Sequence, residues 1–258
     1  MAVKISVLAS SSSGNCTFIS TSRTKILLDA GINPTQAIKR LNSIGESLEA
    51  IDAVVISHEH IDHVNGLSAI LSKKDVPVYI ARETYEALTP CFACSRLEFI
   101  ESGQPFSING LSICGFSIPH DAANPLGFCL EAEGIRVGHV TDLGYMTELV
   151  VQRLKGCDVI VLESNHDLEM LKVGPYPWPL KQRIMSSQGH LSNEVVGRFL
   201  NEEFDGRAQH IILAHLSESN NHPDIARMVA AQALEPRGFD LVNLHVAGKT
   251  NPSPMIQL

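Results

Sequence analysis

Three histidines and two acidic residues lie within six positions of this sequence, in the stretch HEHIDH at residues 58–63. An apolar, β-branched segment over 52–57 leads into this stretch and predicts a buried strand. Side chains alternate between the two sides of an extended chain, so His58 and His60 point to the same side. These two imidazoles are therefore candidate metal ligands, whereas Glu59 points away from them and is not expected to bind a metal.

Asp62 and His63 form a second pair of candidate ligands, because the apolar spacing predicts a helix that begins there and covers 63–72. An acid at a helix start is favoured by the helix dipole even without a metal. Imidazole and carboxylate suit zinc, manganese or iron, and two pairs that face different directions indicate two metal ions. The alternative is a polar strand end without a metal, but His-x-His-x-Asp-His is much more specific than a lone His-x-x-His pair.

Four further candidate ligands each follow a short apolar strand. The carboxyl ends of the strands are where α/β folds usually place their chemistry. Any one of these residues alone would more often be structural, and it is their shared position at strand ends that makes them candidates. They are Asp29 after 25–28, His120 after 111–117, Asp142 after 136–141 and His215 after 211–214.

Glu163 and His190 are candidates for protonating a leaving group. Glu163 ends the strand predicted over 159–162, and His190 stands just before a helix that Ser192 can cap. A histidine that is held by a carboxylate near a metal site can donate a proton to a leaving oxygen. The alternative for His190 is a turn histidine without a chemical role.

A loop of small residues contains Ser11, Ser12, Ser13 and Asn15. Such a loop could hold a phosphate through backbone N–H groups and hydroxyls. A tight turn between two strands explains the same residues equally well.

Aromatic and cationic side chains interleave in one segment, which contains Tyr176, Trp178, Lys181 and Arg183. These residues could stack on a nucleotide and contact its phosphate, with Arg183 as the candidate contact. A proline-rich lid or a buried loop is the alternative.

The composition limits the classes of function. The chain has 258 residues, of which 44 % are hydrophobic, and a formal net charge of −8. A general nucleic-acid binder would normally show a basic face, although two divalent cations would add about four positive charges at the site itself. No apolar run approaches about 18 residues and no signal peptide is recognisable, so we expect no membrane partner and a cytoplasmic location.

The six cysteines are expected to be free thiols, as is usual for cytosolic proteins. Cys91 and Cys94 form a Cys-x-x-Cys pair. A structural zinc site would need a second such pair at usable spacing, and the sequence offers none.

The order of the expected elements favours an α/β protein with two sheets, in a single hydrolase domain over 1–258. The two halves share a rhythm, since each opens with hairpin-like strands and continues with alternating helices and strands. Strands are predicted over 4–8, 17–20, 25–29, 52–57, 78–80, 104–108, 111–117, 127–133, 136–141, 159–162, 210–214 and 241–246. Helices are predicted over 35–43, 66–73, 83–88, 147–154, 167–172, 180–186, 193–202 and 224–232.

The order of the candidate residues resembles the metallo-β-lactamase superfamily along nearly the whole chain. This resemblance implies a four-layer αββα sandwich with the metals at one edge, between the sheets. It also implies that Asp29 orients the metal-binding histidines. The ligands implied are His58, His60 and His120 for one metal, and Asp62, His63 and His215 for the other, with Asp142 bridging the two.

Within the superfamily, the sequence is most similar to the YycJ/WalJ group of exonuclease-like proteins, which is related to RNase Z and the phosphonate-pathway cyclic phosphodiesterase. The third histidine lies in Pro-His-Asp and not in the Gly-His-Thr/Ser-x-Gly context of lactamases, glyoxalase II and many thioesterases. The inserted domain of RNase J and the tRNA-clamping arm of RNase Z are not recognisable. The matching segments lie at 11–16, 28–31, 58–63, 119–121, 141–144, 163–167, 189–193 and 214–217.

The resemblance implies a phosphodiesterase that uses two divalent ions, zinc or manganese, and acts on DNA or RNA as an exonuclease. Asp62 would help to orient the attacking water, and His190, steadied by Glu163, would protonate the leaving oxygen. Nucleic acid is then the expected partner, and a homodimer is one option for the oligomeric state.

Two alternatives stay open. A small-molecule hydrolase of the same fold could cut a cyclic phosphodiester or a lactone. The acidic net charge favours this reading, and the YycJ/WalJ-like segments oppose it. A redox scaffold of the flavodiiron type is the second alternative. It would require iron and an oxygen-reactive site, and the sequence shows no recognisable flavin domain, which opposes it.

Overall fold

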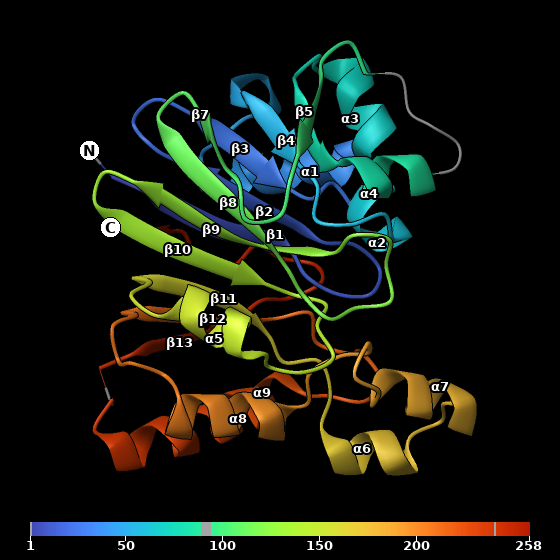
Figure 1. Cartoon of the computed structure of the whole chain (residues 1–258), viewed down its shortest axis with the longest axis vertical. Coiled ribbons are helices and arrows are strands. Elements are labelled where there is room, and N and C mark those ends of the chain that lie inside the picture. Colours follow the sequence, from blue (N-terminus) through green and yellow to red (C-terminus); the bar gives the residue numbers. More distant parts are fainter. Residues whose placement is uncertain (1, 89–93, 240) are drawn as a thin grey trace.

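Two seven-stranded sheets face each other in the computed structural model, which describes residues 2–88, 94–239 and 241–258 (Figure 1). The first sheet has the strand order β14-β1-β2-β3-β4-β5-β6. Its neighbours are antiparallel from β14 to β3 and parallel from β3 to β6. The strands are β1 Lys4–Ala9, β2 Cys16–Ser20, β3 Lys25–Leu28, β4 Ala53–Val55, β5 Val78–Ala81, β6 Leu97–Ile100 and β14 Ile256–Gln257.

The second sheet has the order β13-β12-β11-β10-β9-β8-β7. It repeats the plan of the first, because β7 to β10 are antiparallel neighbours and β10 to β13 are parallel. The shared rhythm predicted for the two halves is therefore confirmed. The strands are β7 Pro105–Ile108, β8 Leu111–Ser117, β9 Leu126–Ala132, β10 Ile135–Val140, β11 Val159–Glu163, β12 His210–Ala214 and β13 Asn243–Val246.

Helices form the two outer layers of the sandwich (Figure 1). Residues of α1 and α3 pack against the first sheet, and residues of α5, α8 and α9 pack against the second. The pair α6 and α7 lies to the side of these layers, at the lower right of the view. The helices are α1 Pro34–Ser43, α2 Ile61–Val64, α3 Leu67–Lys73, α4 Arg82–Ala87, α5 Glu148–Leu154, α6 Leu168–Val173, α7 Trp178–Ile184, α8 Asn193–Glu202 and α9 Pro223–Leu234.

Apolar side chains fill the space between the sheets and the space under each helical layer. Strand β11 shows why this architecture requires nearly continuous apolar strands. Val159 and Val161 pack between the sheets, whereas Ile160 and Leu162 pack under the helices of the second sheet. Because successive side chains point to opposite faces, a strand buried on both faces is apolar throughout. The four-layer αββα sandwich is therefore confirmed.

The predicted strands are all present, with ends that differ by a few residues, but two strands were missed. Strand β6 carries exposed residues at Glu98 and Phe99 and shows no clean alternation. Strand β14 has only two residues, and it depends on pairing with Lys4 and Ile5 at the opposite end of the sequence. Neither strand carries a local signal that would identify it.

A continuous helix from His63 to Ser72 is wrong, because the structure has two short helices there, whereas the helix predicted over 66–73 is confirmed by α3. The chain bends at Asn65 and Gly66, between α2 and α3. The backbone of Gly66 lies so close to another segment that an added Cβ would be 1.8 Å from the Ile32 carbonyl oxygen. Its N–H also donates to the carbonyl of Ala30 at 2.8 Å. This contact with a distant segment decides where the first helix ends.

The cysteines at 16, 94, 114, 129 and 157 are free thiols. Cys91 lies outside the described residues, so the structure does not describe the Cys91–Cys94 pair. None of the described helices combines the length and the apolar character that a membrane crossing requires.

Gly31 joins three segments near the end of the first sheet, and this contact predicts a large effect of a single methyl group. A Cβ at Gly31 would lie 1.6 Å from the carbonyl oxygen of Asp62. Gly31→Ala should therefore lower the free energy of unfolding by about 3 kcal/mol, as overpacking of a rigid contact does. Urea denaturation would measure the change. The matched control is Gly248→Ala, whose Cβ would meet nothing closer than 3.8 Å. Equal stabilities of the two variants would contradict the prediction.

Candidate metal centre

The seven predicted metal ligands come together at one edge of the sandwich, where strand ends of both sheets meet. They fall into groups whose ligand atoms all lie within 4.8 Å of one another. Five of the seven residues are buried, whereas His60 and Asp62 are partly buried. Asp62 is the more exposed of the two carboxylates. The segment after β4 of the first sheet supplies His58, His60, Asp62 and His63. The segments after β8, β10 and β12 of the second sheet supply His120, Asp142 and His215.

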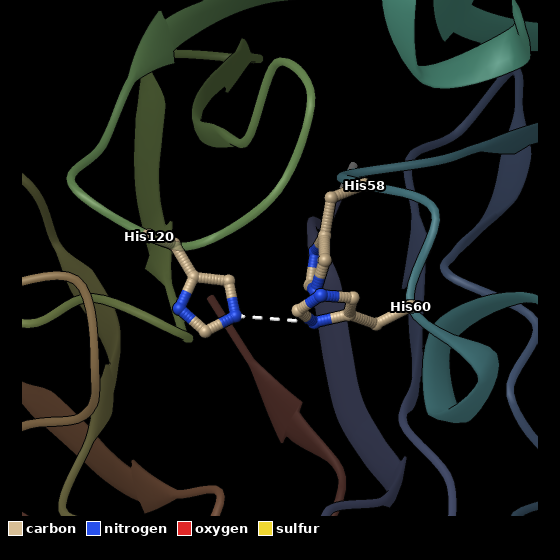
Figure 2. Close-up of side chains that lie close together, drawn as sticks. All are labelled: His58, His60 and His120. Atoms are coloured by element: carbon tan, nitrogen blue, oxygen red, sulfur yellow. Dashed lines mark hydrogen bonds between the residues drawn. The ribbon is translucent and has the colours of Figure 1, made fainter. Parts of the chain in front are cut away.

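His58, His60 and His120 form the first group, in which the three rings surround one point (Figure 2). His120 Nε2 lies 3.2 Å from His60 Nδ1. The rings meet edge to face, with interplanar angles of 77°, 83° and 74°. In a tetrahedral zinc site with Zn–N bonds of about 2.0–2.1 Å, two ligand nitrogens are separated by about 3.4 Å. The separation found here fits an ion held by His60 and His120, and a ring nitrogen of His58 lies within 4.8 Å of both.

Asp62, His63, Asp142 and His215 form the second group. His63 Nε2 lies 3.2 Å from Asp142 Oδ2 and 3.5 Å from Asp62 Oδ2. His215 Nε2 lies 3.5 Å from the same oxygen of Asp62. The other oxygen of Asp142 is 4.0 Å from His120 Nε2. The Asp142 carboxylate therefore lies between the two groups.

Three buried atoms of the cluster make no hydrogen bond with any residue that the structure describes. They are His58 Nε2, Asp142 Oδ2 and His215 Nε2. A buried polar atom without a hydrogen-bond partner costs about 1–3 kcal/mol. All three atoms belong to predicted ligands, and their donor set of imidazole nitrogen and carboxylate oxygen suits zinc, manganese or iron. The residues present thus fit divalent metal ions.

Asp29 contacts a histidine of the second group directly and one of the first group through Ser57. Its Oδ2 lies 2.7 Å from His63 Nδ1, so the Nε2 of His63 is left toward the other ligands. Ser57 extends this contact, because its hydroxyl donates to Asp29 at 2.9 Å and lies 3.0 Å from His58 Nδ1. A carboxylate behind a metal-binding histidine fixes the ring and raises its basicity.

The electrostatic surroundings of the histidines differ between the groups. Burial opposes the charged form of His63, but Asp29 and Asp142 outweigh it and raise the pKa of His63 well above its ordinary value. Burial lowers the pKa of His58 well below its ordinary value, and nearby histidines add to the shift. The carboxylates thus favour the protonated form of His63. Metal binding requires neutral imidazole, so an ion in the second group would displace that proton from His63.

Glu163 connects the candidate ligand His215 to His190. Its Oε1 lies 2.9 Å from His190 Nδ1 and 2.7 Å from His215 Nδ1. Its Oε2 accepts hydrogen bonds from the backbone N–H groups of Leu191 at 2.9 Å and Leu143 at 3.2 Å. Burial penalises the charged carboxylate, but the two imidazoles outweigh burial and lower the pKa of Glu163 to about 2.

His190 is poised differently from the ligands, because its side chain is 22 % exposed. Burial opposes its charged form, but Glu163 outweighs burial and raises the pKa of His190. With Nδ1 engaged by Glu163, Nε2 is the ring nitrogen available to a molecule outside. The two residues predicted as a proton-donating pair are thus in contact, beside the second metal group.

Three residues of the cluster have a left-handed backbone conformation. The φ angles are 63° at Asp29, 61° at Asp142 and 56° at His215. This conformation costs an L-amino acid about 1–2 kcal/mol. Each of the three residues stands just after a strand, so the turn that ends the strand is also the position of the functional side chain. Strain of this kind concentrates at functional sites.

Asn15 and Ser11 lie on the inner side of the loop that was predicted to contact substrate. The Asn15 amide nitrogen is 3.0 Å from Asp62 Oδ2 and 3.0 Å from His63 Nε2. Ser11 is buried, and its hydroxyl accepts a hydrogen bond from the backbone N–H of Ser13 at 3.1 Å. Asn15 is thus placed beside metal ligands, and Ser11 within the turn itself.

Ser12 and Arg183 line a common cavity beside His190. The hydroxyl of Ser13 instead donates to Glu218 Oε1 at 2.9 Å. Lys181 is buried and donates to backbone carbonyls, so it is not available to a phosphate. Of the residues predicted to contact a substrate, the structure therefore places Ser12, Tyr176 and Arg183 at this cavity.

Sequence reasoning missed three residues that support the ligands. Ser57 directly precedes His58, so its position in the motif was a usable signal. The Ser10 hydroxyl accepts from the His215 N–H at 2.6 Å, and the Asn165 side chain donates to the His215 carbonyl at 2.8 Å. These last two contacts join distant segments, and nothing local indicates them.

The facing sheets and the histidine–carboxylate cluster at their edge define a protein of the metallo-β-lactamase fold class. A family model described as β-lactamase superfamily domain matches residues 24–215, and the chain belongs to that family. It is 33 % identical to exodeoxyribonuclease YycJ of Bacillus anthracis, over 98 % of this chain and 97 % of that protein. It is also 33 % identical to exodeoxyribonuclease WalJ of Streptococcus pneumoniae, over 90 % of this chain and 88 % of that protein.

Among solved structures, the metallo-β-lactamase fold protein YhfI from Bacillus subtilis is similar to this chain with a TM-score of 0.74. The alignment covers 100 % of both chains at 17 % identity. A likeness at this level of identity concerns the fold. The predicted superfamily and its YycJ/WalJ-like character are confirmed by the family model and the relatives together.

Metal ions should stabilise the folded protein by mass action. When free Zn²⁺ or Mn²⁺ exceeds its Kd by 100-fold, the free energy of unfolding should rise by about 2.7 kcal/mol. Asp142→Asn should lose most of this gain, because Asp142 lies between both groups. Thermal denaturation of chelator-treated and reloaded protein would measure it. His222→Asn is the control, since it changes a histidine at the start of α9 and retains a capping side chain. An equal gain in Asp142→Asn and wild type would speak against the assignment.

Proposed function

We propose that this protein is a phosphodiesterase that uses two divalent metal ions and cleaves DNA or RNA as an exonuclease. The observation that carries the proposal is the position of Asp142 between two ligand groups, with the Glu163–His190 pair beside the second. A pair of metals can clamp the attacking and leaving oxygens of a phosphate, and a separate acid can serve the leaving group.

The roles of the residues follow from their places in the cluster. His58, His60 and His120 would hold one ion, and Asp62, His63 and His215 the other, with Asp142 between them. When bound, zinc or manganese ions would lower the pKa of water and neutralise charge on the phosphate. Asp62, the more exposed ligand carboxylate, would help to orient the attacking water. Asp29 and Asn15 would keep the second group in place.

His190 would act as the general acid in this reaction. Glu163 accepts a hydrogen bond from Nδ1 and favours the protonated ring, so the proton on Nε2 can be given to the leaving oxygen. The partial exposure of His190 lets a substrate reach that nitrogen. Ser12 and Arg183 would contact the substrate from the neighbouring cavity.

The nucleic-acid substrate is supported by the relatives, since two proteins named exodeoxyribonucleases match most of the chain. We further propose that residues 1–258 act as one hydrolase domain, because β14 pairs with β1 and both sheets build the site. We also propose a cytoplasmic location, which is supported by the free thiols among the described cysteines, because the cytosol keeps thiols reduced.

A small phosphodiester is the second candidate substrate. The net charge of −8 disfavours a polyanion away from the metals, and the cavity beside His190 measures about 190 Å³. A cyclic phosphodiester would need no extended nucleic-acid surface. The two substrates are distinguished by the assay below.

Product analysis tests the proposal directly. Metal-loaded protein should convert end-labelled single-stranded DNA, duplex DNA or RNA into mononucleotides, whereas a protein with His60→Ala and Asp62→Ala should leave them intact. Turnover of a cyclic phosphodiester alone would replace the nuclease with a small-molecule phosphodiesterase. Absence of phosphodiester cleavage with either metal would overturn both.

His190→Ala should separate substrates by their leaving groups. With DNA, kcat should fall by about 10²- to 10⁴-fold, because the leaving sugar oxygen needs a proton. With bis(p-nitrophenyl) phosphate, kcat should stay within about threefold of wild type, since the nitrophenolate leaves without a proton. Steady-state kinetics on both substrates would measure the difference, with His222→Asn as the control histidine. An equal loss on both substrates would show that His190 does not act as the acid.

A further inference from the structure

A cavity of about 190 Å³ opens beside His190 and is not used by the metal ligands. His190 and Gly189 form one side of it, so the cavity adjoins the residue that we propose as the general acid. This places it where the departing part of a substrate would lie. The chemistry of its walls therefore bears on what this protein accepts as a leaving group.

One wall of the cavity is apolar and is built by α7 and the segment before it. Leu180 and Ile184 are four residues apart and line it from one face of α7, and Tyr176 lines it from the segment before the helix. All three side chains are partly buried. Trp178, by contrast, is 58 % exposed and does not line the cavity. The sequence thus places one aromatic ring at the cavity and a second aromatic ring of the same segment outside it.

The apolar wall is held rigidly against the metal centre. Lys181 is buried, and its ammonium donates to the carbonyls of Lys172 at 2.7 Å and Gly174 at 2.8 Å, which ties α7 to α6. At the other end, the His190 N–H donates to the Ile184 carbonyl at 2.9 Å. A Cβ at Gly189 would lie 2.1 Å from that same oxygen. The wall and the general acid therefore form one fixed unit.

The remaining walls are polar. Ser12, Asn165 and Ser217 face the cavity from the loops that also support the ligands. Arg183 forms an ion pair with Asp121, with two guanidinium nitrogens each 2.6 Å from the same carboxylate oxygen. Asp121 directly follows the ligand His120. The cavity thus combines a flat apolar wall with hydroxyl, amide and charged groups, as a site for a single nucleoside would.

We propose that this cavity is a subsite for the nucleoside that leaves with the protonated oxygen, with its base packed on Tyr176 and its sugar toward the polar walls. The inference rests on the proposed phosphodiesterase function and adds a preference among leaving groups to it. Any base offers a flat face to an aromatic ring, so the subsite is expected to select for a nucleoside over a small alcohol without reading sequence.

Two diesters that differ only in the leaving group test the subsite. One is the dinucleotide thymidylyl-(3′→5′)-thymidine, and the other is the methyl ester of thymidine 5′-phosphate, which expels methanol. Hydrolysis of the P–O3′ bond of the dinucleotide expels thymidine, and hydrolysis of the P–O bond to the methyl group's oxygen expels methanol. Both reactions leave thymidine 5′-phosphate, so the metal centre is used in the same way. Metal-loaded wild-type protein should cleave the dinucleotide with a kcat/KM at least about tenfold above that of the methyl ester, because stacking stabilises only the nucleoside.

Variants at two neighbouring aromatic residues locate the effect. Tyr176→Ala should reduce the dinucleotide preference by about tenfold and leave the methyl ester rate unchanged, which also shows that the variant is folded and active. Tyr176→Phe keeps the ring and should behave as wild type. Trp178→Ala removes the exposed aromatic residue of the same segment and should also keep the preference.

The outcomes distinguish the inference from the function on which it rests. Equal cleavage of the two diesters by wild type would overturn the subsite while the phosphodiesterase stands. An unchanged preference in Tyr176→Ala, or an equal loss in Trp178→Ala, would likewise overturn it. If wild type cleaves neither of these diesters nor DNA, RNA or a cyclic phosphodiester, the proposed function fails together with the subsite.

Discussion

Buried carboxylates that are neutralised by imidazoles are the constraint on which this structure depends. Asp29, Asp142 and Glu163 have side chains that are at most 2 % exposed, and such charges are costly to bury unless they are paired. His63 from the first half of the chain reaches Asp142 from the second, at 3.2 Å. The cluster therefore joins the two sheets, and its groups can be satisfied only when both sheets are in place.

The repeated plan of the two sheets explains why the cluster lies at one edge. In each sheet, antiparallel strands are followed by parallel ones. Most of the candidate ligands follow the carboxyl ends of strands with a parallel neighbour, whereas His120 follows the antiparallel strand β8. Packing the sheets face to face brings these ends together, so neither half alone holds a complete ligand group around Asp142. The α6–α7 pair then stands beside this edge, where it can shape the cavity next to His190 without altering the sheets.

The residues that come together in the cluster could be picked out from the sequence, because each follows an apolar strand or belongs to the dense run from His58 to His63. Their supports were harder to predict, since they depend on contacts between distant segments. Asn15 belongs to a loop whose small residues are typical of a phosphate-binding loop, yet its side-chain amide contacts Asp62. The helix break at Gly66 is set by the approach of Ile32, and Arg183 finds its partner Asp121 62 positions away. The periodicity of apolar residues indicates which face of a single helix or strand is buried. It does not indicate contacts between distant segments, which form only when the sandwich is packed.

The left-handed residues of the cluster have a consequence for engineering. Asp29, Asp142 and His215 adopt a backbone that glycine tolerates more easily, and the rest of the fold holds them there. Glycine would relieve the backbone at these positions, but it would also remove the partners of buried charged groups, which costs more. An engineer who searches for strained residues to relax should therefore leave these three unchanged, because backbone strain and paired charge are tied to the same side chains.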